Sequence, residues 1–246
     1  MADKIIIHEI KKSFTSGKEI NLVVDGISLT VGEGEFVAVV GPSGCGKSTL
    51  MKIIAGFEQP DQGHVAIDGI VRKGPNANGI VISQHGSVFP WLNVQQNLMF
   101  GLNGNEHGDK AALADHYAEM VGLKGFEKHY PHELSGGMLK RVEIARALVV
   151  KPEILYMDEP FSALDALMNL RMRTELLRIL EEERHTVLLI THDVEEAIHL
   201  ADRIIVLSPR PARIQATFTV PFPHPRKVSD ADAQALKEAI LRELGL

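Results

Sequence analysis

Short apolar segments alternate with helical patterns along most of the chain. Ile5–Ile10 is rich in β-branched residues, and apolar and polar positions alternate over Ile27–Val31. Glu35–Val40 is a nearly continuous apolar run that ends at Gly41, which is the pattern of a strand buried on both faces of a parallel sheet. Residues 46–55 then have helical spacing, with apolar side chains on one side. This part of the chain therefore predicts strands followed by a strand–loop–helix unit.

The rest of the chain continues the alternation. Asp68-Gly69 predicts a hairpin turn, and helical patterns dominate from about residue 86 to residue 150. The further elements expected are strands at Ile80–Ser83, Ile154–Met157, Val187–Thr191 and Arg203–Leu207, helices at Leu164–Glu183 and Asp230–Leu244, and a proline-rich segment from Pro209 to Pro225. Strands that alternate with helices indicate an α/β fold with a mainly parallel sheet. The helical stretch in the middle is expected to be a lobe inserted into that fold.

Composition and charge narrow the class of protein. The chain has 246 residues, 45% of them hydrophobic, which suits one large domain or one domain with an inserted lobe. The formal net charge is −6, whereas nucleic-acid-binding domains are usually basic. Cys45 is the single cysteine, so an intramolecular disulfide is excluded. The sequence has no apolar stretch of about 18 residues and no secretory signal at its start. A role at a membrane is therefore expected to require docking on other chains from the cytoplasmic side.

A glycine-rich loop follows the buried run. Gly41-Pro42-Ser43-Gly44-Cys45-Gly46-Lys47-Ser48-Thr49 matches the pattern G-x-x-x-x-G-K-[ST] between a predicted strand and a predicted helix. Glycines let successive backbone N–H groups point at phosphate oxygens, and the helix adds the positive end of its dipole. Lys47 is expected to contact the β- and γ-phosphates and Ser48 to bind Mg²⁺. The alternative is a glycine-rich turn that matches the pattern by chance.

Cys45 lies at the start of the predicted helix. A helix N-terminus can lower the pKa of a thiol, and the Cys45 thiol would then be reactive. The alternative is a small side chain that only fills space. Inhibition by a thiol reagent, with protection by ATP, is the outcome expected from the first hypothesis.

A second candidate site lies at the end of another apolar run. Ile154–Met157 is followed directly by Asp158 and Glu159. Asp158 is expected to hold Mg²⁺, and Glu159 is expected to orient and polarise the attacking water. The alternative is a solvated strand end without a function, and the presence of the phosphate loop in the same chain disfavours this alternative. Together the two motifs predict a nucleoside triphosphatase.

A third motif is more specific than the first two, which indicate only a nucleoside triphosphatase. Leu134-Ser135-Gly136-Gly137 precedes an arginine-rich helical segment about twenty residues before the acidic strand end. This arrangement resembles the signature motif of the ATPases of ATP-binding cassette (ABC) transporters, and the likeness covers nearly the whole chain. The other motifs of that family follow in order: Phe14 at the position that stacks on adenine, Gln84 at the Q-loop glutamine, Ser162-Ala163-Leu164-Asp165 at the D-loop and His192 at the switch histidine.

The resemblance implies an architecture. It implies a P-loop NTPase (RecA-like) core with a mainly parallel sheet, an N-terminal antiparallel β subdomain and an inserted helical signature subdomain. In these terms residues 1–246 form one ABC ATPase domain, with a nucleotide-binding core (1–85 and 151–220), a helical subdomain (86–150) and a C-terminal helical tail (221–246). Two copies would pack head to tail around two ATP molecules, and Ser135, Gly136 and Gly137 of one copy would face the phosphate loop of the other.

The resemblance also implies a role for each residue. ATP and Mg²⁺ would be the ligands. Lys47, Ser48 and Thr49 would hold phosphates and metal, Asp158 and Gln84 would complete the metal shell, Glu159 would be the catalytic base, His192 would contact the γ-phosphate, and Asp165 would couple the two sites of the dimer.

Weaker features are similar to the importer branch that takes up nitrate, sulfonates and taurine. Met138 stands where many members of the family have glutamine, His85–Trp91 places Phe89-Pro90-Trp91 where that branch has a Leu-Pro-Trp-like sequence, and Ser208-Pro209-Arg210-Pro211 is typical of the same branch. The partners would be a second copy of the chain, an integral-membrane permease and an extracytoplasmic binding protein, with the chain at the cytoplasmic face of the inner membrane. Phe89 and Trp91 would either seat a permease helix or belong to the core of the helical lobe.

Other hypotheses remain beside the importer. The chain would be the motor of another importer or a small exporter, a soluble ABC ATPase acting on ribosomes or DNA, or a non-catalytic ATP-binding regulator. The soluble ABC ATPase is disfavoured because one cassette without a long coiled coil is unusual in that class, and the non-catalytic regulator because Glu159 and His192 are both present. The eleven histidines are scattered and lack zinc-ligand spacing, so a zinc site is not expected. The sequence does not identify the transported molecule.

Overall fold

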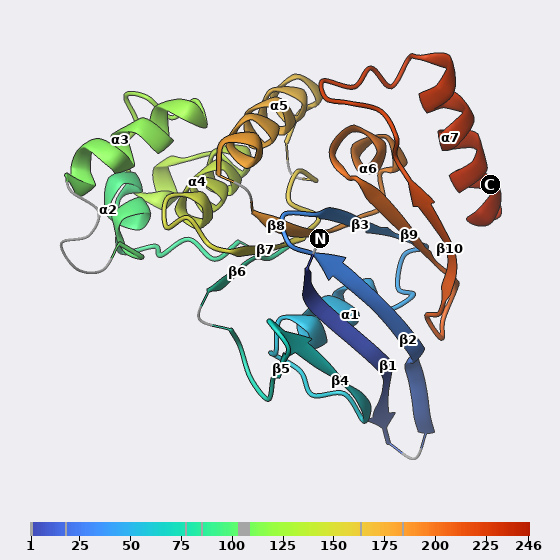
Figure 1. Cartoon of the computed structure of the whole chain (residues 1–246). Helices are drawn as coiled ribbons and strands as arrows, with labels where there is room; N and C mark the ends of the chain where they lie inside the picture. The colour runs from blue at the N-terminus through green and yellow to red at the C-terminus, as the bar shows by residue number, and fades with distance from the viewer. Residues whose placement is uncertain are drawn as a thin grey trace. The chain divides into compact units, whose positions relative to one another are not determined.

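A computed structural model describes residues 2–17, 19–76, 78–84, 86–102, 109–162, 164–183 and 185–246. His85 and Ala163, which belong to two of the predicted motifs, lie outside the described residues. The chain divides into two compact units, one formed by Met1–Gly79 with His185–Leu246 and the other by Ile80–Arg184. Figure 1 shows the elements of both.

The first unit contains a parallel set of strands. Strand β3 (Phe36–Val40) lies between β8 (Thr186–Thr191) and β9 (Arg203–Leu207), and both pairings are parallel. Strand β10 (Ile214–Thr219) adds to β9 in the antiparallel direction. Every residue of β3 and β8 is buried, as expected for strands covered on both faces. Helix α1 (Lys47–Ile54) follows β3. Helix α6 (Val194–Leu200) packs against β3 and β8.

An antiparallel sheet completes this unit. Its strands are β1 (Asp3–Ser16), β2 (Glu19–Gly32), β4 (Gln62–Ile67) and β5 (Ile70–Val71), in the order β2-β1-β4-β5. Asp68 and Gly69, both with positive φ, join β4 to β5, which confirms the predicted hairpin turn. The C-terminal helix α7 (Ala231–Glu243) lies beside α6 and β10 (Figure 1).

The second unit is mainly helical. It contains the neighbouring strands β6 (Gly79–Ile82) and β7 (Ile154–Asp158), the helices α2 (Val94–Met99), α3 (Lys110–Met120), α4 (Gly136–Leu148) and α5 (Ala166–Glu183), and the short 3-10 turn η1 (Pro131–Glu133). Helices α2, α3 and α4 pack against one another. The fully buried amide of Asn97 bonds the backbone of Phe89, Leu92 and Asn93, so it holds the segment before α2 in place.

Most predicted elements are confirmed, and two differ from the prediction. The proline-rich segment contains β10, because residues 214–219 carry no proline and can form a ladder with β9. Helix α5 begins at Ala166, two residues later than predicted, because the Asp165 carboxylate accepts a bond from the Met168 N–H and so caps the helix. Among the described residues, no helix combines the length and apolar character that crossing a bilayer needs.

Candidate nucleotide site

The glycine-rich loop connects β3 to α1, as the sequence predicts. Gly44 and Gly46 have φ values of 71° and 126°, in the region that favours glycine. Gly46 is the N-cap of α1 and provides no side-chain cap. The first N–H groups of the helix therefore remain available for an anion at the positive end of the helix dipole.

Lys47 is buried, and its ammonium group lies within the loop. The Lys47 Nζ donates to the carbonyl oxygens of Gly41 at 2.8 Å and Pro42 at 3.0 Å. The loop therefore surrounds a positive charge with its own backbone. Such a charge at the start of a helix favours a phosphate oxygen as a further partner.

Cys45 does not have the environment of a reactive thiol. Its side chain is buried, and burial raises the pKa of the thiol above its ordinary value, although the nearby Lys47 charge acts in the opposite direction. The hypothesis of an acidified thiol is therefore wrong. The Sγ packs under Gly41, where an added Cβ would lie 3.1 Å from it, so Cys45 fills space beneath the loop.

His192 lies at the same edge of the parallel strands as the loop. Val40 pairs with Thr191, so the residues that follow them, Gly41 and His192, leave neighbouring strands at the same level. The Thr191 hydroxyl accepts a bond from the Asp193 N–H at 3.0 Å, and Asp193 caps α6. The side chain of His192 is exposed. The structure therefore brings together two of the predicted motifs that lie about 150 residues apart.

Phe14 occupies an exposed position near the end of β1. Phe14 is 42% exposed, and the Lys12 Nζ lies 5.2 Å from the ring centroid. An exposed aromatic face is suited to stacking on a planar base, as the sequence predicts for this residue.

The second unit places the acidic strand end beside Gln84. The four residues Ile154–Met157 are buried, and Asp158 and Glu159 follow at the carboxyl end of β7. The Gln84 Nε2 donates to the Glu159 Oε2 at 3.2 Å. Glu159 has a φ of 48°, a value that costs a residue other than glycine about 1–2 kcal/mol and often marks a functional site. The structure thus brings Gln84 and Glu159 together.

Ser135 is the N-cap of α4. Its hydroxyl accepts a bond from the Met138 N–H at 3.3 Å, and Ser135 and Gly136 are both exposed. Further along α4, the Arg141 Nη1 donates to the carbonyls of Val121 and Gly122. Burial lowers the pKa of the Arg141 guanidinium, and the nearby Asp165 carboxylate opposes that shift. The start of α4 is therefore an open helix N-terminus on a helix that is anchored behind it.

A polar cluster around two buried charges in this unit was not predicted from the sequence. Lys140, Glu143, Ser83 and Ser87 form it, and Arg146 donates to Ser87 Oγ at 2.6 Å. The signal that points to it is the carboxylate of Glu143 between Val142 and Ile144, in a helix whose buried positions other than Lys140 are apolar. The partners on residues 83 and 87 lie more than 50 positions away, and no local pattern indicates them.

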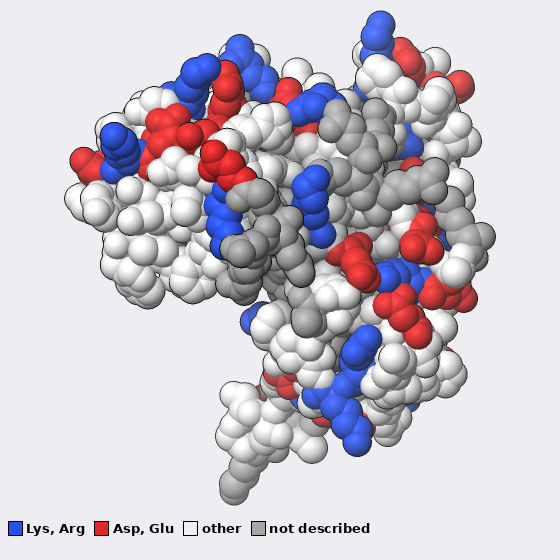
Figure 2. Space-filling model, turned by 60° about the vertical axis from the view of Figure 1, so that its left-hand side comes forward, with Lys and Arg blue, Asp and Glu red and all other residues white. Residues whose placement is uncertain are grey.

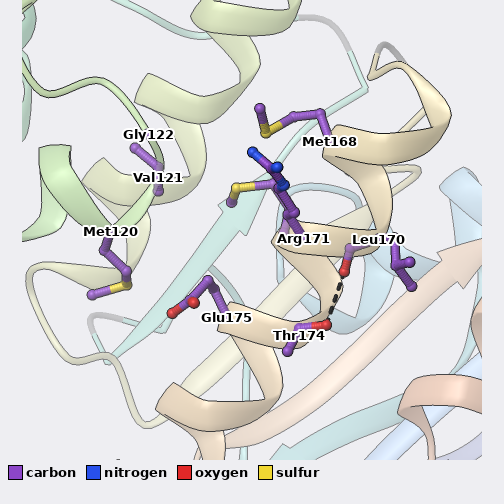
Figure 3. A pocket seen from close by; sticks show the side chains of 9 residues that line it. Met120, Val121, Gly122, Met168, Leu170, Arg171, Thr174 and Glu175 are labelled. Atoms are coloured by element: carbon purple, nitrogen blue, oxygen red, sulfur yellow. Dashed lines mark hydrogen bonds between the residues drawn. The ribbon is translucent and has the colours of Figure 1, made fainter.

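The same unit contains a cavity of about 490 Å³ between the end of α3 and the first half of α5. Figure 3 shows residues that line this cavity, with Met120 at the end of α3 and Met168, Arg171 and Glu175 on α5. Its lining includes none of the residues predicted to contact nucleotide. Val121 and Gly122, whose carbonyl oxygens accept bonds from Arg141 of α4, form part of its wall, so the cavity adjoins the contact that anchors α4.

Comparisons with known proteins agree with these motifs. The family model described as ABC transporter matches residues 24–162. An ABC transporter ATP-binding protein of Methanocaldococcus jannaschii is 42% identical over 246 residues, covering 99% of this chain and 92% of that protein. An aliphatic sulfonates import ATP-binding protein of Bacillus licheniformis is 42% identical over 233 residues, covering 95% of this chain and 91% of that protein. A homologue of the same description in Bacillus subtilis is 41% identical and covers 99% of this chain and 94% of its own length.

A solved structure supports the fold and the activity. It is the dimeric post-hydrolysis state of an ATP-binding cassette bound to ADP and Pi, with a TM-score of 0.79, 30% identity, and coverage of 89% of this chain and all of that chain. The chain belongs to the ABC transporter ATP-binding family, with the α/β fold of the P-loop NTPases. It is an ATPase.

Proposed function

We propose that this ATPase is the motor subunit of an importer for a small anionic solute of the nitrate, alkanesulfonate or taurine type. The observation that carries the proposal is the similarity, over nearly the whole chain, to proteins described as aliphatic sulfonates import ATP-binding proteins. Met138 and the segment Ser208-Pro209-Arg210-Pro211 agree with that branch. The nature of the solute is decided by the partner chains.

The residues of the site suit a nucleotide with Mg²⁺. Lys47 binds the β- and γ-phosphates, and Thr49 and the backbone of the loop surround them. Ser48, Gln84 and Asp158 offer a hydroxyl, an amide carbonyl and a carboxylate, the hard oxygen donors that Mg²⁺ prefers. When bound, Mg²⁺ neutralises phosphate charge. Glu159 accepts a proton from the attacking water, and His192 orients the γ-phosphate.

A head-to-tail dimer completes the proposed site. Two solved structures of one cassette that resembles this chain are dimeric. In the same arrangement, Ser135, Gly136 and Gly137 of one copy would add a second helix N-terminus to the nucleotide of the other. Asp165 would then lie between the two sites. Loss of the γ-phosphate would weaken the interface and let the pair open.

An exposed aromatic strip supports docking on a permease. The strip consists of Phe89, Trp91 and Phe100. The Phe89 ring lies 4.3 Å from Phe100 and 5.4 Å from Trp91 between centroids. Trp91 is 68% exposed and Phe100 58%, which favours an interface over the core of the helical lobe. Figure 2 shows acidic and basic side chains intermixed on parts of the face in view.

The first experiment is to purify the tagged chain from gently solubilised native membranes and to identify what accompanies it. A polytopic permease in about equal amount supports the transporter, and the binding protein produced with it is then screened against nitrate, taurine and alkanesulfonates. Ribosomes, DNA factors or no membrane partner would leave the ATPase intact and overturn the importer.

A variant of the strip tests the docking surface. Trp91→Ala is expected to retain ATPase activity in the isolated chain and to lose most solute uptake and permease co-purification, because aromatic anchors contribute a large share of interface energy. Phe57→Ala removes a similarly exposed aromatic side chain from the other unit and serves as the control. Unchanged uptake with Trp91→Ala would contradict the assignment of the strip to docking.

A further inference from the structure

Two charged side chains are buried together on the inner face of α4. Lys140 is 5% exposed and Glu143 2%, and the Lys140 Nζ lies 3.0 Å from the Glu143 Oε2. The remaining bonds of the pair go to one short segment. The Ser83 carbonyl accepts from Lys140 Nζ, and the Glu143 Oε1 accepts from Ser87 Oγ at 2.8 Å and Ser83 Oγ at 3.4 Å.

Stability alone is a poor reason for such a pair. Two buried charges must give up their hydration, and apolar side chains of similar size at such positions are often as stabilising or more so. The pair does, however, make directional bonds to Ser83 and Ser87, which an apolar pair cannot make. Its effect is therefore to fix a position rather than to increase burial.

The position that it fixes is next to the proposed catalytic residues. Ser83 directly precedes Gln84, and the Gln84 amide contacts the Glu159 carboxylate at 3.2 Å. Lys140 lies five residues after Ser135, the N-cap of α4. The buried pair thus joins the backbone beside Gln84 to the helix that carries the signature motif.

We propose that Lys140 and Glu143 are positioning residues for ATP hydrolysis, because they hold the backbone at Ser83 against α4 and so keep the Gln84 amide on Glu159. The two residues are not among those proposed to contact nucleotide or the attacking water, and they act through Gln84. The inference rests on the roles of Gln84 and Glu159 proposed above and does not depend on the solute or the permease.

The test replaces the pair with apolar side chains of similar size, Lys140→Met with Glu143→Leu. The double variant is expected to unfold at nearly the temperature of the wild type. Its kcat for ATP should fall about 10-fold with little change in KM, since a small misplacement of a catalytic group costs rate rather than binding. The control is Glu119→Leu with Lys124→Met, an exposed ion pair of the same unit, which should leave kcat unchanged. A folded double variant with wild-type kcat would overturn the proposal.

A second measurement separates positioning from a general structural effect. The double variant is combined with Gln84→Ala. If the pair acts through Gln84, the combined variant has the kcat of Gln84→Ala alone, because the shared contribution is lost only once. Additive losses would overturn the inference. If Gln84→Ala by itself leaves kcat unchanged, the proposed role of Gln84 fails, and the inference fails with it for that distinct reason.

A milder substitution covers the case in which the double variant does not fold. Glu143→Gln keeps the shape of the side chain and an acceptor for the two serines but weakens the pairing with Lys140. We expect a smaller fall in kcat, about 3-fold, that also disappears in the Gln84→Ala background. A kcat equal to that of the wild type, or a fall that persists without Gln84, would count against the proposal.

Discussion

The two helix N-termini proposed to bind phosphate differ in how each is built. Helix α1 starts after Gly46 without a side-chain cap, and its first residue, Lys47, is buried. Helix α4 starts after Ser135, whose own hydroxyl already accepts from the Met138 N–H, and Gly136 is exposed. The first terminus is packed against its own unit at Lys47, and we call it the enclosed terminus; the second has an exposed first glycine, and we call it the open terminus.

The space around the glycine at the start of each helix, Gly46 for α1 and Gly136 for α4, shows the same contrast. A Cβ on Gly46 would lie 3.0 Å from Val23 Cγ1 and 3.1 Å from the Val23 carbonyl oxygen, whereas a Cβ on Gly136 would meet no atom within 4 Å among the described residues. The phosphate loop is therefore preorganised by packing within its own unit. The start of α4 has free space at Gly136 among the described residues, which agrees with the proposed dimer.

The largest effect is expected at the enclosed terminus. Lys47→Ala removes the positive charge that the loop surrounds, and ATPase activity should fall by roughly 10²–10³-fold, because preorganised charges in a closed site contribute strongly to phosphoryl transfer. Steady-state hydrolysis and nucleotide binding by the purified variant measure this. Turnover equal to that of the wild type would remove Lys47 from the proposed site.

The sequence could predict the motifs of the site that are contiguous in the chain, but not the contacts between distant positions. The phosphate loop and the acidic strand end are contiguous motifs that the local pattern indicates, and the start of α4 was indicated by its resemblance to the ABC signature motif. The contact of Gln84 with Glu159 joins positions 75 residues apart, and the cluster around Glu143 joins positions 56 and 60 apart. No local periodicity records such pairs. For Cys45 the sequence left two hypotheses open, an acidified thiol at a helix N-terminus and a small side chain that fills space, and burial beneath the loop supports the second.

Gly46→Ala tests the packing of the enclosed terminus. At a φ of 126° an alanine is strained, and its Cβ also presses on Val23, so the loop must shift. We expect a loss of about 1–3 kcal/mol in the free energy of unfolding together with weakened ATP binding. Denaturant unfolding with and without ATP measures both. An unchanged unfolding midpoint would show that the loop adjusts freely, which contradicts preorganisation.

Gly136→Ala is the matched test at the open terminus. Since the Cβ meets nothing within the described chain and alanine favours helix, the stability of the isolated chain should be unchanged or slightly higher. The Cβ would nevertheless stand between the α4 N–H groups and a nucleotide held by the partner copy. In a Glu159→Gln background, which is expected to bind ATP without hydrolysing it, the added methyl group should weaken the ATP-dependent dimer several-fold. Sedimentation with ATP checks this, and a dimer of unchanged strength would argue against the head-to-tail arrangement.

The smallest effect concerns Cys45, the single thiol of the enclosed loop. Because burial raises the pKa of this thiol, little thiolate is present near neutral pH, and a thiol reagent should label folded Cys45 far more slowly than the unfolded chain. As the pH rises, labelling of the folded chain should keep accelerating beyond the range in which an ordinary thiol has fully ionised. Mass spectrometry of timed samples follows the reaction, and Cys45→Ala is the control for labelling elsewhere. Rapid labelling of the folded protein at neutral pH would mean that the loop opens readily, and the contrast between an enclosed and an open helix terminus would then fail.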